Sequence, residues 1–196
     1  MTLLYLIRHG ETLLNNTGVL QGITDYPLNE AGIKQSKNLV LKMKDINLDH
    51  ILSSTLKRSY MTAAYLADSK NLEIEKLKSL GEIDFGAWEN MHYKEIERLY
   101  PRKWRSWCVD SLNSSPLYGE SFDDFFDRVT DALISILDLY KEKTVAIVSH
   151  DGVMRIMASF LLKMDKQGFW NFYFEHGKYS LFEVIDDICM IRRINV

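Results

Sequence analysis

The sequence predicts an α/β fold, as a three-layer α/β/α sandwich with a largely parallel central sheet and a small helical insertion. Short apolar segments typical of buried strands alternate with longer segments whose apolar residues recur at helical spacing. The chain of 196 residues, 46% hydrophobic and 26% charged, has the size and composition of one globular domain. We therefore expect a single domain over residues 1–196, in which residues 86–120 form a helical, aromatic lid.

The first predicted elements are a strand and a helix. Residues 3–7, LLYLI, have no polar face, which is typical of a central strand covered on both sides. Asn29 is the predicted N-cap of a helix that runs to about Lys44, and Leu39 and Met43 lie on one face of it. This helix therefore has one apolar face available for packing.

A second strand and helix follow. Residues 50–53 form another buried strand, and Ser54 or Thr55 is the predicted start of the next helix. Small residues such as Ala63 and Ala67 supply the packing contacts of that helix.

The middle of the chain, residues 86–119, changes character. Aromatic side chains are mixed there with charged ones, and Pro101 and Pro116 interrupt the segment. The aromatic residues are Trp88, Tyr93, Tyr100, Trp104, Trp107 and Tyr118. We interpret the segment as the helical lid, whose aromatic cluster either lines a ligand pocket or forms a small satellite core.

The clearest helix of the sequence starts at Ser121, which forms a capping box with Asp124. Phenylalanines and aliphatic residues repeat at helical spacing over residues 122–137. Residues 144–149 form a further buried strand, which leads into a helix over residues 153–162. Alternation of strands and helices predicts the parallel part of the sheet.

The last two predicted strands are residues 179–185 and 189–194. Asp186 and Asp187 join them as a hairpin. No internal repeat or linker interrupts the chain, which supports the expectation of one domain.

Composition excludes several classes of protein. With 24 basic and 27 acidic residues the net charge is −3, so the charge signature of a dedicated nucleic-acid-binding protein is missing. Cys108 and Cys189 have no metal-ligand spacing and make no disulfide framework, so we expect inert packing residues in a reducing compartment. The short apolar run before Arg8 fits neither a signal peptide nor a membrane span. We expect a cytoplasmic protein without nucleic-acid or membrane partners; the sequence predicts no oligomeric state.

Histidines and arginines follow the predicted strands. In open α/β sheets, ligands bind beyond the carboxyl ends of the strands. Arg8 and His9 follow the first strand, Arg58 comes shortly after the second, and His150 follows the strand at residues 144–149. Two histidines and two arginines at one edge of a sheet indicate a bound dianion, most simply a phosphate.

Five motifs in a fixed order connect these residues to a known family. They are RHGET, SSTLKRSYMTA, LGEIDFGAWEN, GES and VSHDGVMR. In this order the chain resembles the histidine phosphatase superfamily, which includes cofactor-dependent phosphoglycerate mutases, broad phosphomonoesterases and α-ribazole phosphatases. The resemblance covers nearly the whole chain, and the five ordered motifs are far more specific than RHG alone.

The resemblance implies a role for each matching residue. His9 would be the nucleophile that becomes phosphohistidine, with Arg8, Arg58 and His150 around the phosphoryl group. Glu82 would donate a proton to the departing oxygen and then activate water, for which its pKa must be raised. A neutral imidazole can attack phosphorus in line, and guanidinium groups can hold the charge that spreads over the equatorial oxygens.

Four further residues are candidates for substrate binding. Asn15, Gln21 and Gly22 match the family's phosphate-contacting loop, although Asn15 and Gln21 also fit simple turn residues. Gly152 opens a helix, where backbone N–H groups favour an anion.

Two positions depart from the family pattern. Asp151 and Asn90 stand where many relatives have glycine. A carboxylate near a phosphate is unfavourable unless it points away, so Asp151 puts the backbone role of that position in doubt.

The remaining candidates have simpler interpretations. We expect His50, His92 and His176 to be hydrogen-bonded structural residues. We expect Ser121 to be a helix cap and Arg128 to pair with a carboxylate. No histidines have metal-ligand spacing, so the site residues include no metal ligands and we expect no metal or other cofactor.

The sequence therefore predicts a metal-independent phosphomonoester hydrolase that acts through phosphohistidine, with the helical insertion over the active site. Its substrate would be α-ribazole 5'-phosphate or a broad range of small phosphate esters. A cofactor-dependent phosphoglycerate mutase is the alternative, disfavoured because the mutases are longer and carry a larger insertion. A phospholigand-binding protein with little turnover is the second alternative.

Overall fold

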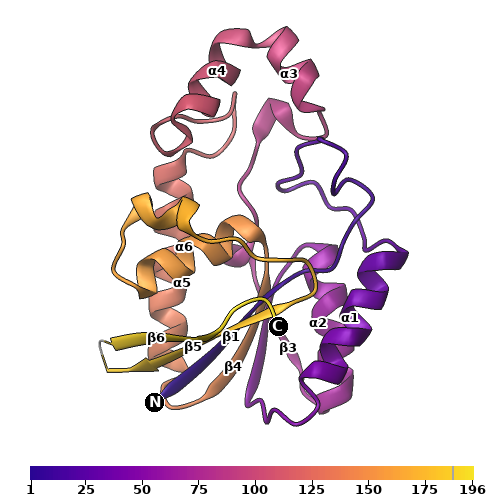
Figure 1. Ribbon diagram of the computed structural model, residues 1–196, viewed down its shortest axis with the longest axis vertical. Coiled ribbons are helices and arrows are strands. Elements are labelled where there is room, and N and C mark those ends of the chain that lie inside the picture. The colour runs from indigo at the N-terminus through magenta and orange to yellow at the C-terminus, as the bar shows by residue number, and fades with distance from the viewer. Residues whose placement is uncertain (187) are drawn as a thin grey trace.

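A six-stranded sheet forms the centre of the computed structural model, which describes residues 1–186 and 188–196 (Figure 1). Its strands are β1 (Thr2–Arg8), β2 (His50–Ser54), β3 (Ile74–Leu77), β4 (Thr144–Ser149), β5 (Tyr179–Ile185) and β6 (Ile188–Arg193). They lie in the order β3-β2-β4-β1-β5-β6. The first four strands in this order are parallel, and β5 and β6 are antiparallel to their neighbours.

Helices cover both faces of the sheet, which confirms the predicted three-layer sandwich. The α-helices are α1 (Glu30–Lys42), α2 (Lys57–Lys70), α3 (Tyr93–Leu99), α4 (Pro101–Val109), α5 (Phe122–Leu139) and α6 (Asp151–Leu161). Short 3₁₀ turns are η1 (Lys78–Leu80), η2 (Gly86–Trp88), η3 (Ser111–Asn113) and η4 (Lys166–Asn171). In Figure 1, α1 and α2 lie on one side of the sheet and α5 and α6 on the other.

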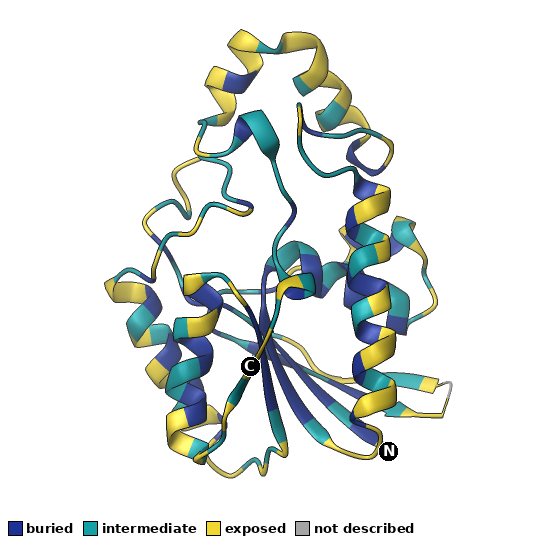
Figure 2. Cartoon of the chain, turned by 180° about the vertical axis from the view of Figure 1, so that it is seen from behind, coloured by how far each residue is buried: buried dark blue, intermediate teal, exposed yellow. Residues whose placement is uncertain are grey.

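Alternating side chains of the central strands divide the core in two. Leu4 and Leu6 of β1 pack with α5 and α6, whereas Tyr5 and Ile7 pack with α1 and α2. Because β1 is buried on both faces, its sequence has no polar face, as predicted. Figure 2 shows the result as dark strands between helices whose outer faces are exposed. Fully burying one such aliphatic side chain contributes about 1.5–3 kcal/mol.

Helix caps largely follow the sequence. The side chain of Asn29 accepts a hydrogen bond from the N–H of Gly32, and that of Ser121 accepts one from the N–H of Asp124, so both predicted N-caps are confirmed. The predicted start of α2 at Ser54 or Thr55 is wrong, because α2 begins at Lys57. The Ser54 hydroxyl instead contacts Nε2 of His150 and accepts from the N–H of Leu56.

Other boundaries differ by a few residues. Helix α6 begins at Asp151, two residues before the predicted start at 153, so that His150 itself is the N-cap residue. Strand β3 was not predicted. The predicted hairpin is confirmed as the antiparallel pair β5–β6, while Asp187 of its connection lies outside the described residues.

Residues 86–120 extend beyond the carboxyl ends of the parallel strands. They contain α3 and α4, which lie at the end of the molecule away from the strand amino termini (Figure 1). The segment is therefore helical, as predicted, and Pro101 is the first residue of α4. In the described ranges, no helix has both the length and the apolar character needed to cross a bilayer.

Candidate active site

The two histidines that follow β1 and β4 lie side by side. Because these strands are parallel neighbours, Arg8 pairs with Ser149, and the N–H of His9 donates to the carbonyl of Ser149 at 3.0 Å. The rings of His9 and His150 are 5.1 Å apart between centroids and meet edge to face. Both residues are buried. From β1 the chain continues to β2 towards one edge of the sheet, whereas from β4 it continues to β5 towards the other edge. Such a switch point between neighbouring parallel strands is where α/β proteins bind ligands.

Arg58 joins the two histidines from α2. Its Nε–H lies 3.2 Å from Nε2 of His9 and 3.2 Å from Nδ1 of His150. Since a guanidinium only donates, both ring nitrogens must accept and therefore carry no proton. The proton of His9 is on Nδ1, 2.7 Å from the carbonyl of Gly10, and that of His150 is on Nε2, 2.9 Å from the Ser54 hydroxyl. These tautomers follow from the hydrogen-bond network.

The surroundings keep both imidazoles neutral. Burial lowers the pKa of His9 well below its usual range, and the positive charge of Arg58 lowers it further. Burial and Arg58 act in the same direction on the pKa of His150. Burial also lowers the pKa of Arg58 to about 10, which still leaves the guanidinium charged at neutral pH. The site thus combines neutral imidazoles with a permanent cation.

Arg8 supplies a second cation. Its Nη1 donates to the carbonyl of Phe174 at 2.5 Å and lies 3.6 Å from Oδ1 of Asp151. Its Nε is buried and finds no hydrogen-bond partner within the described part of the chain. A buried donor of this kind suits an anionic ligand.

Glu82 lies at the start of the segment that leads to α3 and α4. Its Oε1 accepts from the N–H of Ile83 at 3.0 Å, and its Oε2 accepts from the N–H of Gly152 at 3.2 Å. Burial raises the pKa of Glu82, and these two backbone hydrogen bonds oppose the rise in part. Glu82 therefore holds its proton at higher pH than an exposed glutamate does. A Cβ on Gly152 would lie 2.5 Å from Oε1 of Glu82, so this approach requires glycine.

The candidate loop residues are placed in different ways. The side-chain oxygen of Asn15 accepts from the N–H of Thr12 at 2.7 Å, and that of Gln21 accepts from the Thr12 hydroxyl at 2.8 Å. Both amides thus form hydrogen bonds within the loop that follows β1. Gly22 reaches the site through its backbone, because its carbonyl accepts from Nη2 of Arg58 at 2.6 Å.

Glu89 was not singled out in the sequence, although it lies within one of the family motifs. Its carboxylate accepts from the N–H groups of Gly22, Ile23, Thr24 and Phe85 and from the Thr24 hydroxyl. The carbonyls of Gly22 and Thr24 in turn accept from Arg58. Glu89 therefore fixes the loop that orients the Arg58 guanidinium.

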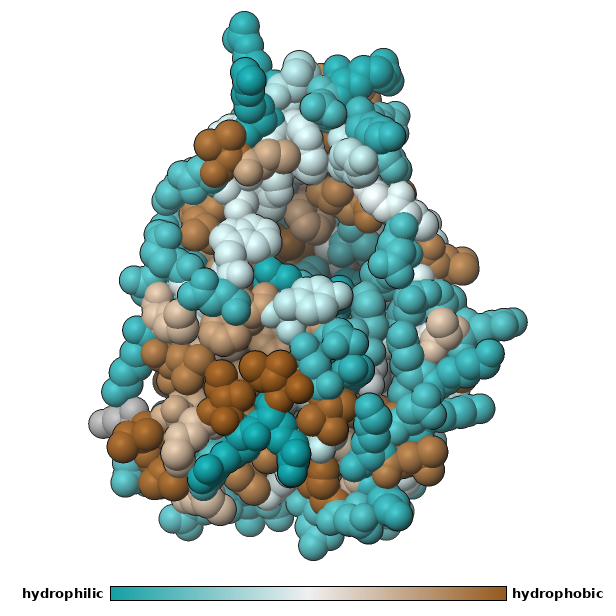
Figure 3. Space-filling view, viewed as in Figure 1, coloured by the Kyte–Doolittle hydropathy of each residue, from teal (hydrophilic) through white to brown (hydrophobic). Residues whose placement is uncertain are grey.

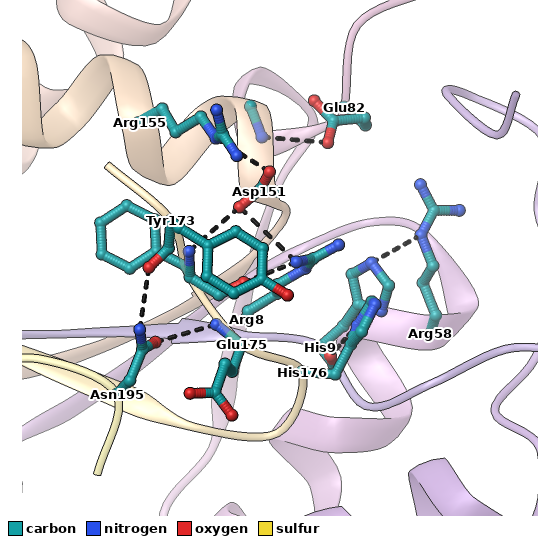
Figure 4. A network of polar contacts seen from close by, with 12 residues as sticks. Arg8, His9, Arg58, Glu82, Asp151, Arg155, Tyr173, Glu175, His176 and Asn195 are labelled. Atoms are coloured by element: carbon teal, nitrogen blue, oxygen red, sulfur yellow. Dashed lines mark hydrogen bonds and ion pairs between the residues drawn. The ribbon is translucent and has the colours of Figure 1, made fainter. Parts of the chain in front are cut away.

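The sequence did not reveal that His176 lies beside His9. Its ring lies 5.2 Å from that of His9, and its Nδ1 is 3.1 Å from the carbonyl of His9. Burial lowers the pKa of His176 to about 4 and Arg8 acts in the same direction. The expectation of a hydrogen-bonded histidine is confirmed, and the hydrogen bond is to the backbone of His9 itself. Figure 4 shows His176 beside His9.

The two departures from the family pattern have physical explanations. Asn90 adopts a φ of 63°, in the left-handed region that glycine favours and that asparagine tolerates. Asp151 turns its carboxylate to Arg155, whose Nε donates to Oδ2 at 2.9 Å, and to Arg8. Its charge is therefore paired on two sides.

A cavity of about 350 Å³ adjoins these polar groups and is lined mainly by aromatic rings. The polar lining includes Arg8, Glu82, Asp151, Gly152 and Arg155; the aromatic lining is Phe85, Trp104, Trp107, Phe122, Phe125, Phe169 and Trp170. Figure 3 shows this face of the molecule hollowed below the segment of α3 and α4.

The aromatic cluster is divided between the wall of this cavity and a small core. Trp104 and Trp107 line the cavity, whereas Trp88 is completely buried beneath them. Tyr93 stacks on His92 and does not line this cavity, and Tyr118 is exposed.

The other single residues have local roles. Nδ1 of His92 accepts from the N–H of Lys94 at the start of α3, and His50 packs on Tyr140. Arg128 pairs with Glu120, as predicted. The thiol of Cys189 is partly buried, but Cys108 is exposed, so the prediction of a packing role for Cys108 is wrong. Within residues 1–186 and 188–196, no three His, Cys, Asp or Glu side chains are grouped so that they could hold a metal ion.

The geometry allows a specific chemistry. An imidazole nitrogen without a proton lies beside Arg58, with Arg8 close by, so a phosphoryl group that displaces the Arg58 hydrogen bond could be held and attacked there. A carboxyl group whose pKa is raised by burial could supply a proton to a leaving oxygen.

Comparison with known proteins identifies relatives over the whole chain. The profile of the histidine phosphatase superfamily (branch 1) matches residues 4–196. Phosphoserine phosphatase 1 of Hydrogenobacter thermophilus is 36% identical over 100% of this chain and 93% of its own. The adenosylcobalamin/alpha-ribazole phosphatase of Salmonella typhimurium is 33% identical over 98% of this chain and 95% of its own. The crystal structure of the alpha-ribazole phosphatase of Shigella flexneri superposes with a TM-score of 0.94 at 31% identity, covering 99% of this chain and 96% of that one.

Proposed function

Because the chain belongs to the histidine phosphatase superfamily, we propose that it hydrolyses phosphate monoesters through a phosphohistidine formed on Nε2 of His9. The observation that carries this proposal is the hydrogen bond from Nε of Arg58 to that nitrogen, 3.2 Å long. It shows that Nε2 of a neutral imidazole carries an unprotonated electron pair next to a fixed positive charge, and the entering phosphoryl group would take the place of the Arg58 donor on that electron pair. An ordinary structural histidine needs no such arrangement.

The first step transfers the phosphoryl group to the protein. The electron pair of Nε2 forms a bond to phosphorus, and the bond from phosphorus to the ester oxygen breaks. The proton of Glu82 moves to that oxygen, so the alcohol leaves neutral. Arg8 and Arg58 hold the phosphoryl oxygens, on which negative charge accumulates.

The second step releases phosphate. The Glu82 carboxylate takes a proton from water while the water oxygen attacks phosphorus, and the bond to Nε2 breaks. The electron pair returns to the imidazole, and Glu82 is protonated again. His150 remains neutral and, through its hydrogen bond to Arg58, helps to fix the guanidinium.

The proposed substrate is a small monoester with a flat, largely apolar alcohol part. The aromatic cavity beside Glu82 and Arg8 supports this choice, since aromatic rings favour stacked or edge-to-face contacts. α-Ribazole 5'-phosphate is our first candidate because two of the compared relatives are named for it. We also propose a cytoplasmic location, supported by the two free thiols.

A panel of monoesters tests the function. The protein is assayed for phosphate release from α-ribazole 5'-phosphate, phosphoserine, 3-phosphoglycerate and p-nitrophenyl phosphate, and acid-labile phosphate on the protein is trapped by rapid quenching. Turnover with a labelled phosphohistidine supports the proposal. Conversion of 3-phosphoglycerate to 2-phosphoglycerate would support the mutase instead, and tight binding without turnover would support a binding protein.

A further inference from the structure

Arg155 is a charged residue in the wall of the aromatic cavity that the proposed chemistry does not use. Its guanidinium lies 5.5 Å from the ring centre of Phe169 and 5.2 Å from that of Trp170, and its Nε donates to Oδ2 of Asp151 at 2.9 Å. Only 12% of the Arg155 side chain is exposed. A cation fixed in the wall of the cavity that is proposed to hold the alcohol part of the substrate would be expected to attract an alcohol part that carries a carboxylate.

Asp151 changes that expectation, because it pairs with Arg155 in the same wall. Its Oδ1 lies 3.6 Å from Nη1 of Arg8 and accepts from the N–H of Phe174 at 3.4 Å. Asp151 therefore lies between the arginine next to His9 and the arginine of the cavity wall, as Figure 4 shows. The charge of Arg155 is offset in part before any substrate enters, because the one carboxylate of Asp151 is shared with Arg8.

We propose that Asp151 is a specificity residue that selects against phosphate esters whose alcohol part carries a carboxylate. A carboxylate that approaches Arg155 meets the carboxylate of Asp151 on the same guanidinium, and like charges at such distances repel. A neutral ring meets only an ion pair and aromatic surface. An ammonium group on the alcohol part finds an acceptor in the Asp151 carboxylate. The inference rests on the proposed function and deepens it.

Three matched substrates test the charge preference. Phenyl phosphate, 4-carboxyphenyl phosphate and 4-(aminomethyl)phenyl phosphate place no charge, a negative charge or a positive charge at one position of the same ring. The quantity measured is kcat/KM for each charged ester divided by kcat/KM for phenyl phosphate. Comparing this ratio between variants cancels the intrinsic reactivity of each ester and any general damage to phosphoryl transfer.

Two substitutions should shift the ratio in opposite directions. Asp151→Asn keeps a hydrogen-bond acceptor for Arg155 but removes the charge, so it should raise the relative use of the carboxylate ester by about tenfold, equivalent to about 1.4 kcal/mol. Arg155→Met leaves the Asp151 charge without its cavity-side partner, so it should lower that ratio and raise the one for the ammonium ester. Asp123→Asn, which removes a surface carboxylate paired with Lys166, should change neither.

The outcomes separate this inference from the proposed function. Unchanged ratios in both variants, or an equal loss for all three esters, would overturn the role of Asp151 in selection. If the wild-type protein hydrolyses none of the esters and forms no phosphohistidine, the proposed function fails. In that case dissociation constants of the three esters, measured with the His9→Ala forms of each variant, still test the charge preference.

Discussion

Nε of Arg58 donates a hydrogen bond to Nε2 of His9 over 3.2 Å, which leaves that imidazole nitrogen without a proton. The remaining ring proton of His9 points to the carbonyl of Gly10. The histidine is thereby held as a neutral nucleophile before substrate binds, and several measurable consequences follow from this pair.

Replacing His9 with alanine should abolish turnover and leave the fold intact. The variant has no electron pair to attack phosphorus, so acid-labile phosphate trapped from substrate should disappear in rapid-quench experiments. His92→Ala is the matched control, since His92 caps α3 and stacks on Tyr93 without contacting the site, and it should keep wild-type turnover. Near wild-type activity in His9→Ala would contradict a covalent intermediate on this residue.

Activity should survive removal of metal ions and should be inhibited by vanadate. Arg8 and Arg58 supply positive charge where a metal would otherwise be needed, and a five-coordinate vanadate resembles phosphorus in the transition state. Steady-state rates are measured after dialysis against EDTA and in a titration with vanadate. Loss of activity in EDTA that a divalent cation restores would show the prediction to be wrong.

Phosphoryl transfer to His9 should remain fast over a wider pH range than the ordinary pKa values of a histidine and a glutamate would allow. The pKa of His9 is lowered, so the nucleophile stays neutral below the usual histidine range as pH falls. The pKa of Glu82 is raised, so the acid keeps its proton above the usual glutamate range as pH rises. Single-turnover phosphorylation rates, measured from acid to mildly alkaline pH, should remain high below the usual histidine range and decline on the alkaline side.

Glu82→Gln provides the control for that decline. The amide has no proton to lose, so the part of the alkaline decline that belongs to Glu82 should vanish, while ionisation of the substrate affects both proteins equally. The variant should also lose about 10²–10⁴-fold with an alkyl phosphate and much less with p-nitrophenyl phosphate. Equal losses for both esters would argue against Glu82 as the acid.

Glu89→Gln should weaken catalysis from a distance. The substitution removes the charge that holds the N–H groups of residues 22–24, so the carbonyls that orient Arg58 lose their support. We expect kcat to fall by about tenfold with a smaller change in KM, and stability to fall by about 1–3 kcal/mol. Kinetics and denaturant unfolding are compared with Glu95→Gln, an exposed residue of α3. A tenfold rise in KM with unchanged kcat would contradict a role of Glu89 in orienting Arg58.

Trp104→Ala should raise KM for aromatic monoesters by about fivefold, equivalent to about 1 kcal/mol, because one ring contact of the cavity is lost. Small esters such as 3-phosphoglycerate should be affected little. Tyr93→Ala serves as the control, since Tyr93 stacks on His92 away from the cavity lining. If the two variants behaved alike, the cavity would not be the site of the alcohol part.

Sequence alone predicted the parts of the fold that depend on local pattern. Strand β4 lies at the predicted residues 144–149, because its apolar run has sharp ends. Strand β3 escaped prediction because Ile74–Leu77 is short and includes Glu75 and Lys76, and charged side chains are typical of an edge strand. In the sequence alone, a segment this short with two charged residues is equally typical of a loop.

The candidate site was predictable where its residues follow strands directly, as His9 and His150 do. The position of His176 beside His9 was not predictable, because it depends on a contact between segments far apart in the sequence. In that contact the N–H of Gly177 donates to the carbonyls of Arg8 and His9. Glu89 carries no sequence signal of its own, since a glutamate that accepts several backbone N–H groups looks like any surface glutamate until the loop at residues 22–24 is placed against it.

Three of the four tryptophans of the chain, Trp104, Trp107 and Trp170, line one cavity, and the fourth is buried beneath it. Tryptophan emission therefore comes from side chains that line that cavity or lie beneath it. An aromatic alcohol that enters it should quench or shift the emission without any attached label. In a stopped-flow instrument, this signal would time the arrival and departure of the alcohol separately from the appearance of phosphate.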